Sequence, residues 1–210
     1  MFEVNTAILL VVSLVGLVAI GVHIAIALGI TSALGIWLVT GAGGSIGSEL
    51  MRQVSAFGPA EIGLLDNSEH ALYTIDREAL EEWPDVPRSS VIADVRDRNR
   101  ISRIFAHFRP DLVFHAAALK HVPLVEENIV EGTTTNVAGT ANIADTCVRI
   151  GVKTMVLIST DKAVNPSSVM GATKRIAESY CQVLDLEHAE GPGKDNGTRF
   201  VTVRFGNVLG

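Results

Sequence analysis

From residue 35 onward, short apolar runs alternate with longer segments in which apolar residues recur every three or four positions. The short runs have the length of buried strands, and the longer segments have the period of amphipathic helices. This alternation is typical of repeated βα units that build a parallel sheet. The pattern predicts six strands, at 36–40, 61–65, 90–93, 112–115, 154–159 and 200–204.

The segments between these strands predict helices that end near 56 and span about 69–82, 98–107, 130–149 and 168–187. Six strands with helices between them predict an α/β fold, a Rossmann-type doubly wound parallel sheet in the order 3-2-1-4-5-6. We therefore expect residues 35–210 to form an NAD(P)-binding Rossmann domain. Because the chain stops directly after the sixth strand, we expect this domain to be truncated and to lack a substrate-binding part.

Residues 1–34 form a separate hydrophobic segment. No Asp, Glu, Lys or Arg lies between Glu3 and Glu49, and the apolar run 7–28 is long enough as a helix to cross a bilayer core of about 30 Å. A signal peptide is less favoured, because no Lys or Arg precedes the run. We expect a transmembrane helix that binds the lipid bilayer of the inner membrane, with the Rossmann domain in the cytoplasm. The alternative is a helix buried in a larger protein or an oligomer.

Charge and cysteine content narrow the function classes. The formal net charge is −6, which argues against a nucleic-acid binder, because neutralising phosphates requires a basic face. Cys147 and Cys181 have neither the spacing of metal ligands nor the pattern of a disulfide scaffold. We expect two reduced, buried thiols, which fit a cytoplasmic compartment, and no metal site.

A glycine-rich turn between the first strand and the first helix is the strongest local signal. Gly41, Gly44 and Gly47 have the spacing GxxGxxG, with Ser45 and Ile46 between the last two. Such glycines tighten the turn, let the backbone approach a pyrophosphate, and let the helix pack closely on the strand. The helix N-terminus supplies free N–H groups and partial positive charge for the anion. The alternative is a glycine-rich turn of another fold.

The ends of the next three strands carry the other predicted cofactor contacts. Asp66 ends the second strand, where a carboxylate can accept hydrogen bonds from the adenosine ribose and would repel a 2′-phosphate. The cofactor is therefore predicted to be NAD, with NADP as the alternative. Asp94 follows the third strand and is expected at the adenine edge. Ala116 and Ala117 follow the fourth strand and keep the backbone close to the cofactor, although tight packing alone also explains them.

Polar residues gather where the fifth strand ends. Thr160, Asp161 and Lys162 lie at the carboxyl edge of the sheet, where α/β proteins place their sites. Lys174 lies on the following helix, and Met170 is four residues earlier on the same face. Ordinary surface charge is the alternative interpretation of both lysines.

Four segments together resemble the polysaccharide-biosynthesis (CapD-like) nucleotide-sugar 4,6-dehydratases, extended members of the short-chain dehydrogenase/reductase superfamily. They are TGAGGSIGSEL (40–50), FHAAALKHVPLVEEN (114–128), STDKAVNPSSVMGATKRIAE (159–178) and VRFGNVLG (203–210). The resemblance covers about residues 36–210 and implies a UDP-N-acetylglucosamine-type substrate and a role in cell-surface glycan synthesis. Larger members are membrane-anchored and normally carry several spans, so a single hydrophobic segment departs from the family pattern.

The resemblance also implies a mechanism. Hydride leaves sugar C4 for the cofactor, the resulting ketone acidifies the C5 proton, water leaves from C6, and the hydride returns to C6. By position, Asp161 matches the family's acid, Lys162 its C5 base, and Lys174 the lysine that holds the nicotinamide ribose. Met170 stands where most of the superfamily has a tyrosine base. The larger members of this family resemble this sequence in having methionine at that position. The group that accepts the C4 hydroxyl proton is left open between Asp161 and Thr160.

Three other interpretations stay open. The chain could be a nucleotide-sugar 4-epimerase, although Asp161-Lys162 and Met170 favour the dehydratase. Residues 21–37 resemble the first hydrophobic segment of the large permease subunit of TRAP-type transporters, which raises a fusion of two unrelated pieces. A truncated or fused product would bind cofactor without catalysis. A homo-oligomer is a further expectation.

Overall fold

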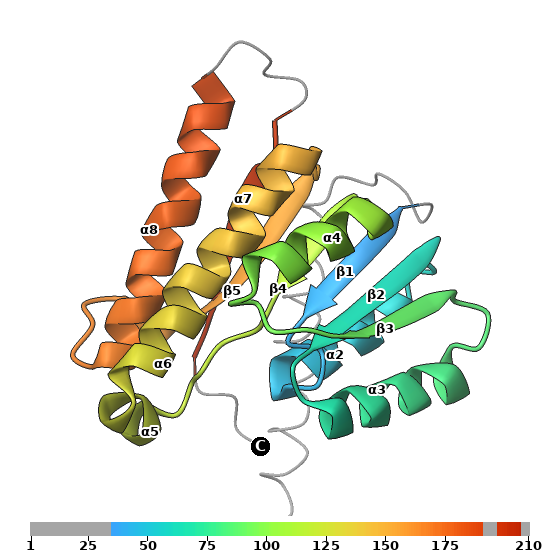
Figure 1. Ribbon diagram of the computed structural model, residues 1–210, viewed down its shortest axis with the longest axis horizontal. Coiled ribbons are helices and arrows are strands. Elements are labelled where there is room, and N and C mark those ends of the chain that lie inside the picture. The colour runs from blue at the N-terminus through green and yellow to red at the C-terminus, as the bar shows by residue number, and fades with distance from the viewer. Residues whose placement is uncertain (1–34, 191–196, 207–210) are drawn as a thin grey trace, which may run out of the picture. The chain divides into compact units, whose positions relative to one another are not determined.

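The computed structural model describes residues 35–190 and 197–206. Its centre is a sheet of six parallel strands in the order β3-β2-β1-β4-β5-β6 (Figure 1). The predicted Rossmann-type order is therefore confirmed. The strands are β1 (Ile36–Thr40), β2 (Glu61–Asp66), β3 (Arg88–Ile92), β4 (Leu112–His115), β5 (Thr154–Thr160) and β6 (Arg199–Phe205).

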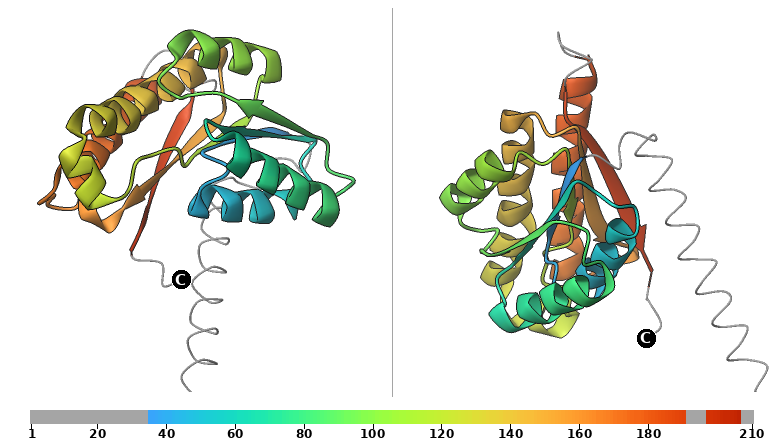
Figure 2. Two further views of the ribbon diagram at one scale, coloured as in Figure 1. Left: turned by 60° about the horizontal axis from the view of Figure 1, so that its bottom comes forward. Right: turned by 90° about the vertical axis from the view of Figure 1, so that its right-hand side faces the viewer.

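Helices cover both faces of the sheet (Figure 2). α2 (Ser45–Ser55) and α3 (Glu69–Glu82) pack on one face, and α4 (Arg98–Phe108), α7 (Thr140–Ile150) and α8 (Val169–Glu190) pack on the other. Right-handed crossovers require this division, because the strand order runs outward in both directions from β1. Because all six strands are parallel, their carboxyl ends lie at one edge of the sheet, and the strand order reverses between β1 and β4.

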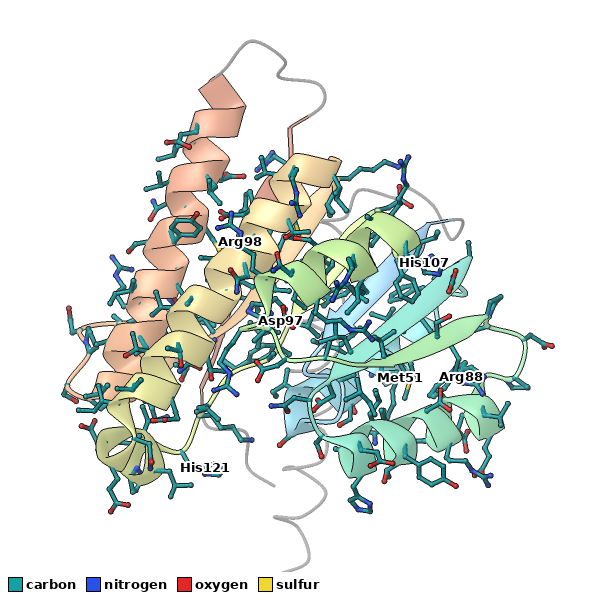
Figure 3. The ribbon with its side chains drawn as sticks, viewed as in Figure 1. Met51, Arg88, Asp97, Arg98, His107 and His121 are labelled. Atoms are coloured by element: carbon teal, nitrogen blue, oxygen red, sulfur yellow. The ribbon has the colours of Figure 1, made fainter. Side chains whose placement is uncertain are left out.

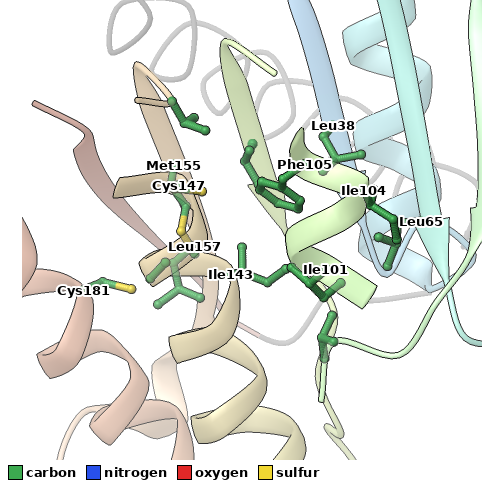
Figure 4. Packing of buried hydrophobic residues seen from close by; sticks show 14 of the residues in the cluster. Leu38, Leu65, Ile101, Ile104, Phe105, Ile143, Cys147, Met155, Leu157 and Cys181 are labelled. Carbon is green, nitrogen blue, oxygen red and sulfur yellow. The ribbon is translucent and has the colours of Figure 1, made fainter. Parts of the chain in front are cut away.

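A hydrophobic core lies between the sheet and the helices α4, α7 and α8 (Figure 4). In α4 the buried residues recur at helical spacing: Ile101, Ile104, Phe105 and Phe108. The side chain of Asp97 starts this helix by accepting a hydrogen bond of 2.9 Å from the backbone N–H of Arg100 (Figure 3). Every second residue of the strands points toward these helices, among them Val113 of β4 and Met155 and Leu157 of β5.

One predicted helix differs from the structure. The segment 130–149 is not a continuous α-helix but α6 (Ile129–Thr133), a π-helical segment η1 (Thr134–Gly139) and then α7. The widened turn contains Asn136, which is fully buried and directs its amide away from the helix onto the backbone of Leu119. Helical periodicity does not register such a local change of turn, because a π-segment adds only one residue per turn.

Smaller differences occur at the sheet edge and after β4. β3 begins at Arg88 rather than at residue 90, because an edge strand pairs through its backbone without needing apolar side chains. A short helix, α5 (Val122–Glu127), was not predicted, although Pro123 in its first turn is a recognised start signal.

The predicted membrane span at 7–28 lies outside the described residues. Within 35–190 and 197–206, none of the helices combines the length and the apolar composition that crossing a bilayer requires.

Candidate cofactor and catalytic site

The glycine loop, residues 41–47, packs against the ends of β2 and β4. The backbone N–H of Gly41 donates to the carbonyl oxygen of Leu65 at 2.8 Å, and its φ of +70° lies in the left-handed region. A Cβ atom at Gly41 would lie 2.6 Å from the backbone of Ala117, and one at Gly47 would overlap the carbonyl oxygen of Gly41. These two positions therefore require glycine, as the sequence predicted, because the backbones approach too closely for a side chain.

The loop delivers the chain into the N-terminus of α2. Gly44 precedes this helix, and the first turn contains no acidic residue. Ser45, the first residue of α2, is exposed, and its hydroxyl oxygen accepts a hydrogen bond of 2.8 Å from Lys120 Nζ. Ile46 is half-buried behind it. A lysine ammonium at the positive end of a helix dipole creates a local site that favours an anion.

The orientation of the Asp66 side chain is fixed by hydrogen bonds from the backbone around it. Its side chain is buried at the end of β2, and each carboxylate oxygen accepts one backbone N–H at 2.9 Å, from Gly43 and from Ser68. These two bonds set the orientation of the carboxylate before any ligand arrives. Asp66 thus braces the glycine loop as well as lining the space in front of it.

That space is an open cleft of about 280 Å³ at the point where the strand order reverses. It brings together Gly41, Gly44, Asp66, Asp94, Ala116 and Ala117 from the predicted cofactor residues. Its remaining lining is Gly43, Leu65, Asn67, Ser68, Ala71, Ala93, Val95, Ala118, Leu119 and Thr135. Small side chains from three strand ends therefore leave room for a flat, extended ligand.

Asp94 lines the cleft and forms an ion pair with Arg96. The guanidinium of Arg96 donates to both of its carboxylate oxygens, at 2.5 to 3.0 Å, and the Arg96 backbone N–H adds a bond of 2.9 Å. These side-chain hydrogen bonds from Arg96 lower the pKa of the Asp94 carboxyl despite its partial burial. The pair keeps Asp94 ionised and places a neutralising charge beside it.

A hydrogen-bond chain supports the end of β4. His115 is buried, its Nδ1 lies 2.7 Å from Thr40 Oγ1, and its Nε2 lies 3.0 Å from Thr140 Oγ1. Thr140 donates its only hydroxyl proton to the carbonyl oxygen of Asn136 at 2.7 Å. It must therefore accept from Nε2–H, which leaves Nδ1 as an acceptor for Thr40. Burial lowers the pKa of His115 to about 3, with a smaller contribution from Lys174, so the ring is neutral.

Thr160, the last residue of β5, forms a chain of contacts with the exposed Asp161 and Lys162 that follow it. Thr160 Oγ1 donates to Asp161 Oδ1 at 2.8 Å, and Lys162 Nζ lies 3.3 Å from the same oxygen. The bond from Thr160 and then the contact with Lys162 lower the pKa of the Asp161 carboxyl. A hydroxyl, a carboxylate and an amine are thereby joined at the carboxyl edge of the sheet, and proton transfer between them needs only short movements.

Lys174 is buried on α8, and its Nζ donates to the carbonyl oxygen of Ile158 at 2.6 Å. Burial lowers the pKa of Lys174 to about 8, while the charge of Glu178 one turn later opposes the shift. Met170 is also buried, one turn before Lys174. Thr160, Asp161, Lys162, Met170 and Lys174 are not among the residues that line the 280 Å³ cleft, so the described groups fall into two neighbouring parts of one sheet edge.

Comparison with known sequences decides the family. Residues 37–210 match the family described as polysaccharide biosynthesis protein. The chain belongs to this family. The resemblance to CapD-like proteins is thereby confirmed, since the chain is 50% identical over 174 residues to the capsular polysaccharide biosynthesis protein CapD of Staphylococcus aureus. That match covers 82% of this chain and 28% of CapD.

Two further relatives carry more specific names. Over 119 residues the chain is 41% identical to the inverting UDP-N-acetylglucosamine 4,6-dehydratase of Campylobacter jejuni, a match that covers 57% of this chain and 34% of that enzyme. The solved UDP-glucose 4-epimerase of Thermus thermophilus in complex with NAD is 30% identical, with a TM-score of 0.64 over 80% of this chain and 54% of that one. The chain therefore spans less than two thirds of the length of each of these relatives.

Sequence reasoning missed four residues that the structure brings to the site. They are Arg96 at Asp94, Lys120 at Ser45, Asn136 at Leu119 and Glu178 near Lys174. Glu178 lies four residues after Lys174, a spacing that predicts a shared helix face. Lys120 and Asn136 depend on contacts between separate segments, for which the sequence pattern carries no signal. Arg96 lies only two residues after Asp94, in a turn whose conformation the hydrophobic pattern does not predict.

Proposed function

We propose that this chain is the cofactor-binding and catalytic module of an NAD-dependent nucleotide-sugar 4,6-dehydratase that acts in cell-surface polysaccharide synthesis. The substrate class is a UDP-N-acetylglucosamine-type nucleotide sugar. The observation that carries the proposal is the orientation of Asp66, a buried carboxylate held by two backbone N–H groups in a cleft whose lining is rich in glycine and alanine.

The described residues fit a dinucleotide. The backbone around Gly41 and Gly47 leaves no space for side chains, which is the condition for close approach of a pyrophosphate. The N-terminus of α2 and Lys120 would hold its negative charge. Asp66 would accept the ribose hydroxyls and disfavour a 2′-phosphate, so NAD is proposed over NADP. When bound, NAD would supply a hydride acceptor for sugar C4.

The chain's own groups would carry the proton transfers. Asp161, which already accepts the hydroxyl proton of Thr160, would take up the C4 hydroxyl proton directly or through Thr160. Lys162 would remove the C5 proton in its neutral form, and Asp161 would then return a proton to the departing C6 hydroxyl. Lys174 would hold the nicotinamide ribose. Met170 has no proton to exchange and would fill space one turn away.

The test is a chimera. The region of the Campylobacter jejuni dehydratase that matches this chain is replaced by the corresponding residues of this chain, and the product is followed by NMR in D₂O with UDP-N-acetylglucosamine. We expect a 4-keto-6-deoxy product with deuterium at C5. Substituting Lys162→Ala in the chimera should abolish both signals while NAD binding persists. A chimera that interconverts C4 epimers without loss of water would refute the dehydratase assignment.

A further inference from the structure

A buried carboxylate with a partly exposed arginine partner lies on the same helix as the lysine of the site. Glu178 on α8 is 4% exposed, and its carboxylate accepts two hydrogen bonds from the Arg204 guanidinium of β6, at 2.8 and 2.7 Å. Arg175 adds a longer contact of 3.4 Å. Burial alone would raise the pKa of the Glu178 carboxyl, but these bonds, Arg204 foremost, lower it on balance. The carboxylate is therefore ionised inside the protein.

The pair lies at the carboxyl end of two neighbouring strands. Arg204 of β6 is the register partner of Ser159 of β5, next to the predicted catalytic Thr160. Among the described residues the Ser159 hydroxyl finds no hydrogen-bond partner, yet it lies near enough to Glu178 to lower that carboxyl's pKa. Glu178 thus spans from helix α8 to the junction of β5 and β6, directly beside the site.

Glu178 also faces Lys174. The two residues are one helical turn apart on the buried side of α8. Lys174 Nζ donates a hydrogen bond to the carbonyl oxygen of Ile158, the residue before Ser159. The ionisable groups that interact with Lys174 are Glu178 and Cys181 on its own helix and His115 on β4. Of these, the thiol of Cys181 and the ring of His115 are neutral at pH 7, because burial raises the pKa of the first to about 12 and lowers that of the second to about 3.

We propose that Glu178 is a positioning residue for the cofactor lysine: anchored to β6 by Arg204, its buried carboxylate keeps the Lys174 ammonium charged and directed at the end of β5. The role rests on the proposed function, since Lys174 is the group that would hold the nicotinamide ribose. In this proposal Glu178 and Arg204 position Lys174, in addition to joining α8 to β6. A buried ammonium without a nearby carboxylate loses its proton more readily.

The chain contains a matched control pair. Asp185 and Arg199 also join α8 to β6, with 3.2 Å between Asp185 Oδ1 and Arg199 Nε, and Asp185 accepts the backbone N–H of Phe200. This pair lies at the opposite end of β6 from Arg204. Asp185→Asn therefore removes an ion pair between the same two elements, but far from Lys174.

The experiment is an NMR titration of lysine ¹³Cε resonances from pH 6 to 11 in the whole chain, which contains only five lysines. Lys174→Met assigns the resonance. We expect Glu178→Gln to lower the midpoint of Lys174 by about half a unit or more, and Arg204→Gln to raise it, because the remaining carboxylate is then uncompensated. Asp185→Asn should leave the midpoint unchanged.

The proposal is overturned if Glu178→Gln leaves the Lys174 midpoint in place, or if Asp185→Asn moves it by as much. Should Glu178→Gln fail to fold, the upward shift in Arg204→Gln decides in the same way. The titration needs no cofactor. A parallel calorimetric titration of the same samples with NAD⁺ reports separately on the proposed function.

Discussion

The β1–β3 half of the site is formed largely by backbone, whereas the β4–β6 half is formed by charged side chains. In the first half, glycines bring strands into contact and one carboxylate is fixed by two N–H groups, so a cleft exists in the described structure. In the second half, Lys174 and Glu178 are buried with their charges, while Asp161 and Lys162 lie exposed. The first half is shaped by close backbone approach, which leaves no room for a Cβ at Gly41 and Gly47. The second half is shaped by charge and is expected to be sensitive to pH.

The largest effect should come from adding one methyl group to the backbone-built half. Gly41→Ala adds a Cβ that meets the Ala117 backbone, in addition to left-handed strain. Gly58→Ala is the matched control, because Gly58 has a φ of +63° but open space around it. We expect the free energy of unfolding to fall by about 1–2 kcal/mol for Gly58→Ala and by about 3 kcal/mol or more for Gly41→Ala. Equal losses in denaturant unfolding would show that the close approach to β4 does not matter.

In the β4–β6 half of the site, replacing the buried Lys174 should stabilise the protein. The pKa of Lys174 is lowered to about 8 from an ordinary value near 10.5. The unfolded chain therefore binds this proton more tightly, and the ammonium destabilises the fold below pH 8. We expect Lys174→Met to raise the free energy of unfolding at pH 7 by roughly 1–3 kcal/mol while weakening NAD⁺ binding.

The pH dependence of stability tests whether the charged Lys174 destabilises the fold. Wild-type stability should rise relative to Lys174→Met as the pH increases from 8 to 10.5, because the unfolded state holds more protons in that window. Parallel stability curves for the two proteins would contradict the buried-ammonium account. Arg103→Met, on exposed α4 surface, serves as the control for loss of a surface cation.

His115 joins the two halves and should confer acid sensitivity. Its pKa is about 3 in the fold, below the ordinary 6.5, so the unfolded state binds more protons as the pH falls through 6.5. We expect the wild type to lose about 2 kcal/mol of stability between pH 6.5 and 5, before most carboxylates titrate. His115→Gln should show a smaller loss over this range in urea unfolding at each pH. An unchanged slope would mean that another group controls acid stability.

The sequence predicted the two halves unequally. The glycine spacing predicted the loop, because each glycine marks a local backbone requirement. The alternation of strands and helices predicted the strand order and placed Asp66 at the end of β2. The sequence could not predict that Asp66 also braces Gly43, because this contact joins residues 23 positions apart. The Asp94–Arg96 ion pair and the π-turn at Asn136 are local, but they depend on backbone conformations that hydrophobic periodicity does not encode. The positions of Asp161, Lys162 and Lys174 were predicted, but their burial and charge environment were not.

The central claim is that Asp66 makes the cleft an NAD site, and calorimetric titration of the chain with NAD⁺ and NADP⁺ tests it most directly. We predict that the wild type binds NAD⁺ at least about tenfold more tightly than NADP⁺, a difference of about 1.4 kcal/mol. Asp66→Asn, which keeps the shape and removes the charge, should narrow that difference. Tighter binding of NADP⁺ by the wild type would contradict the account.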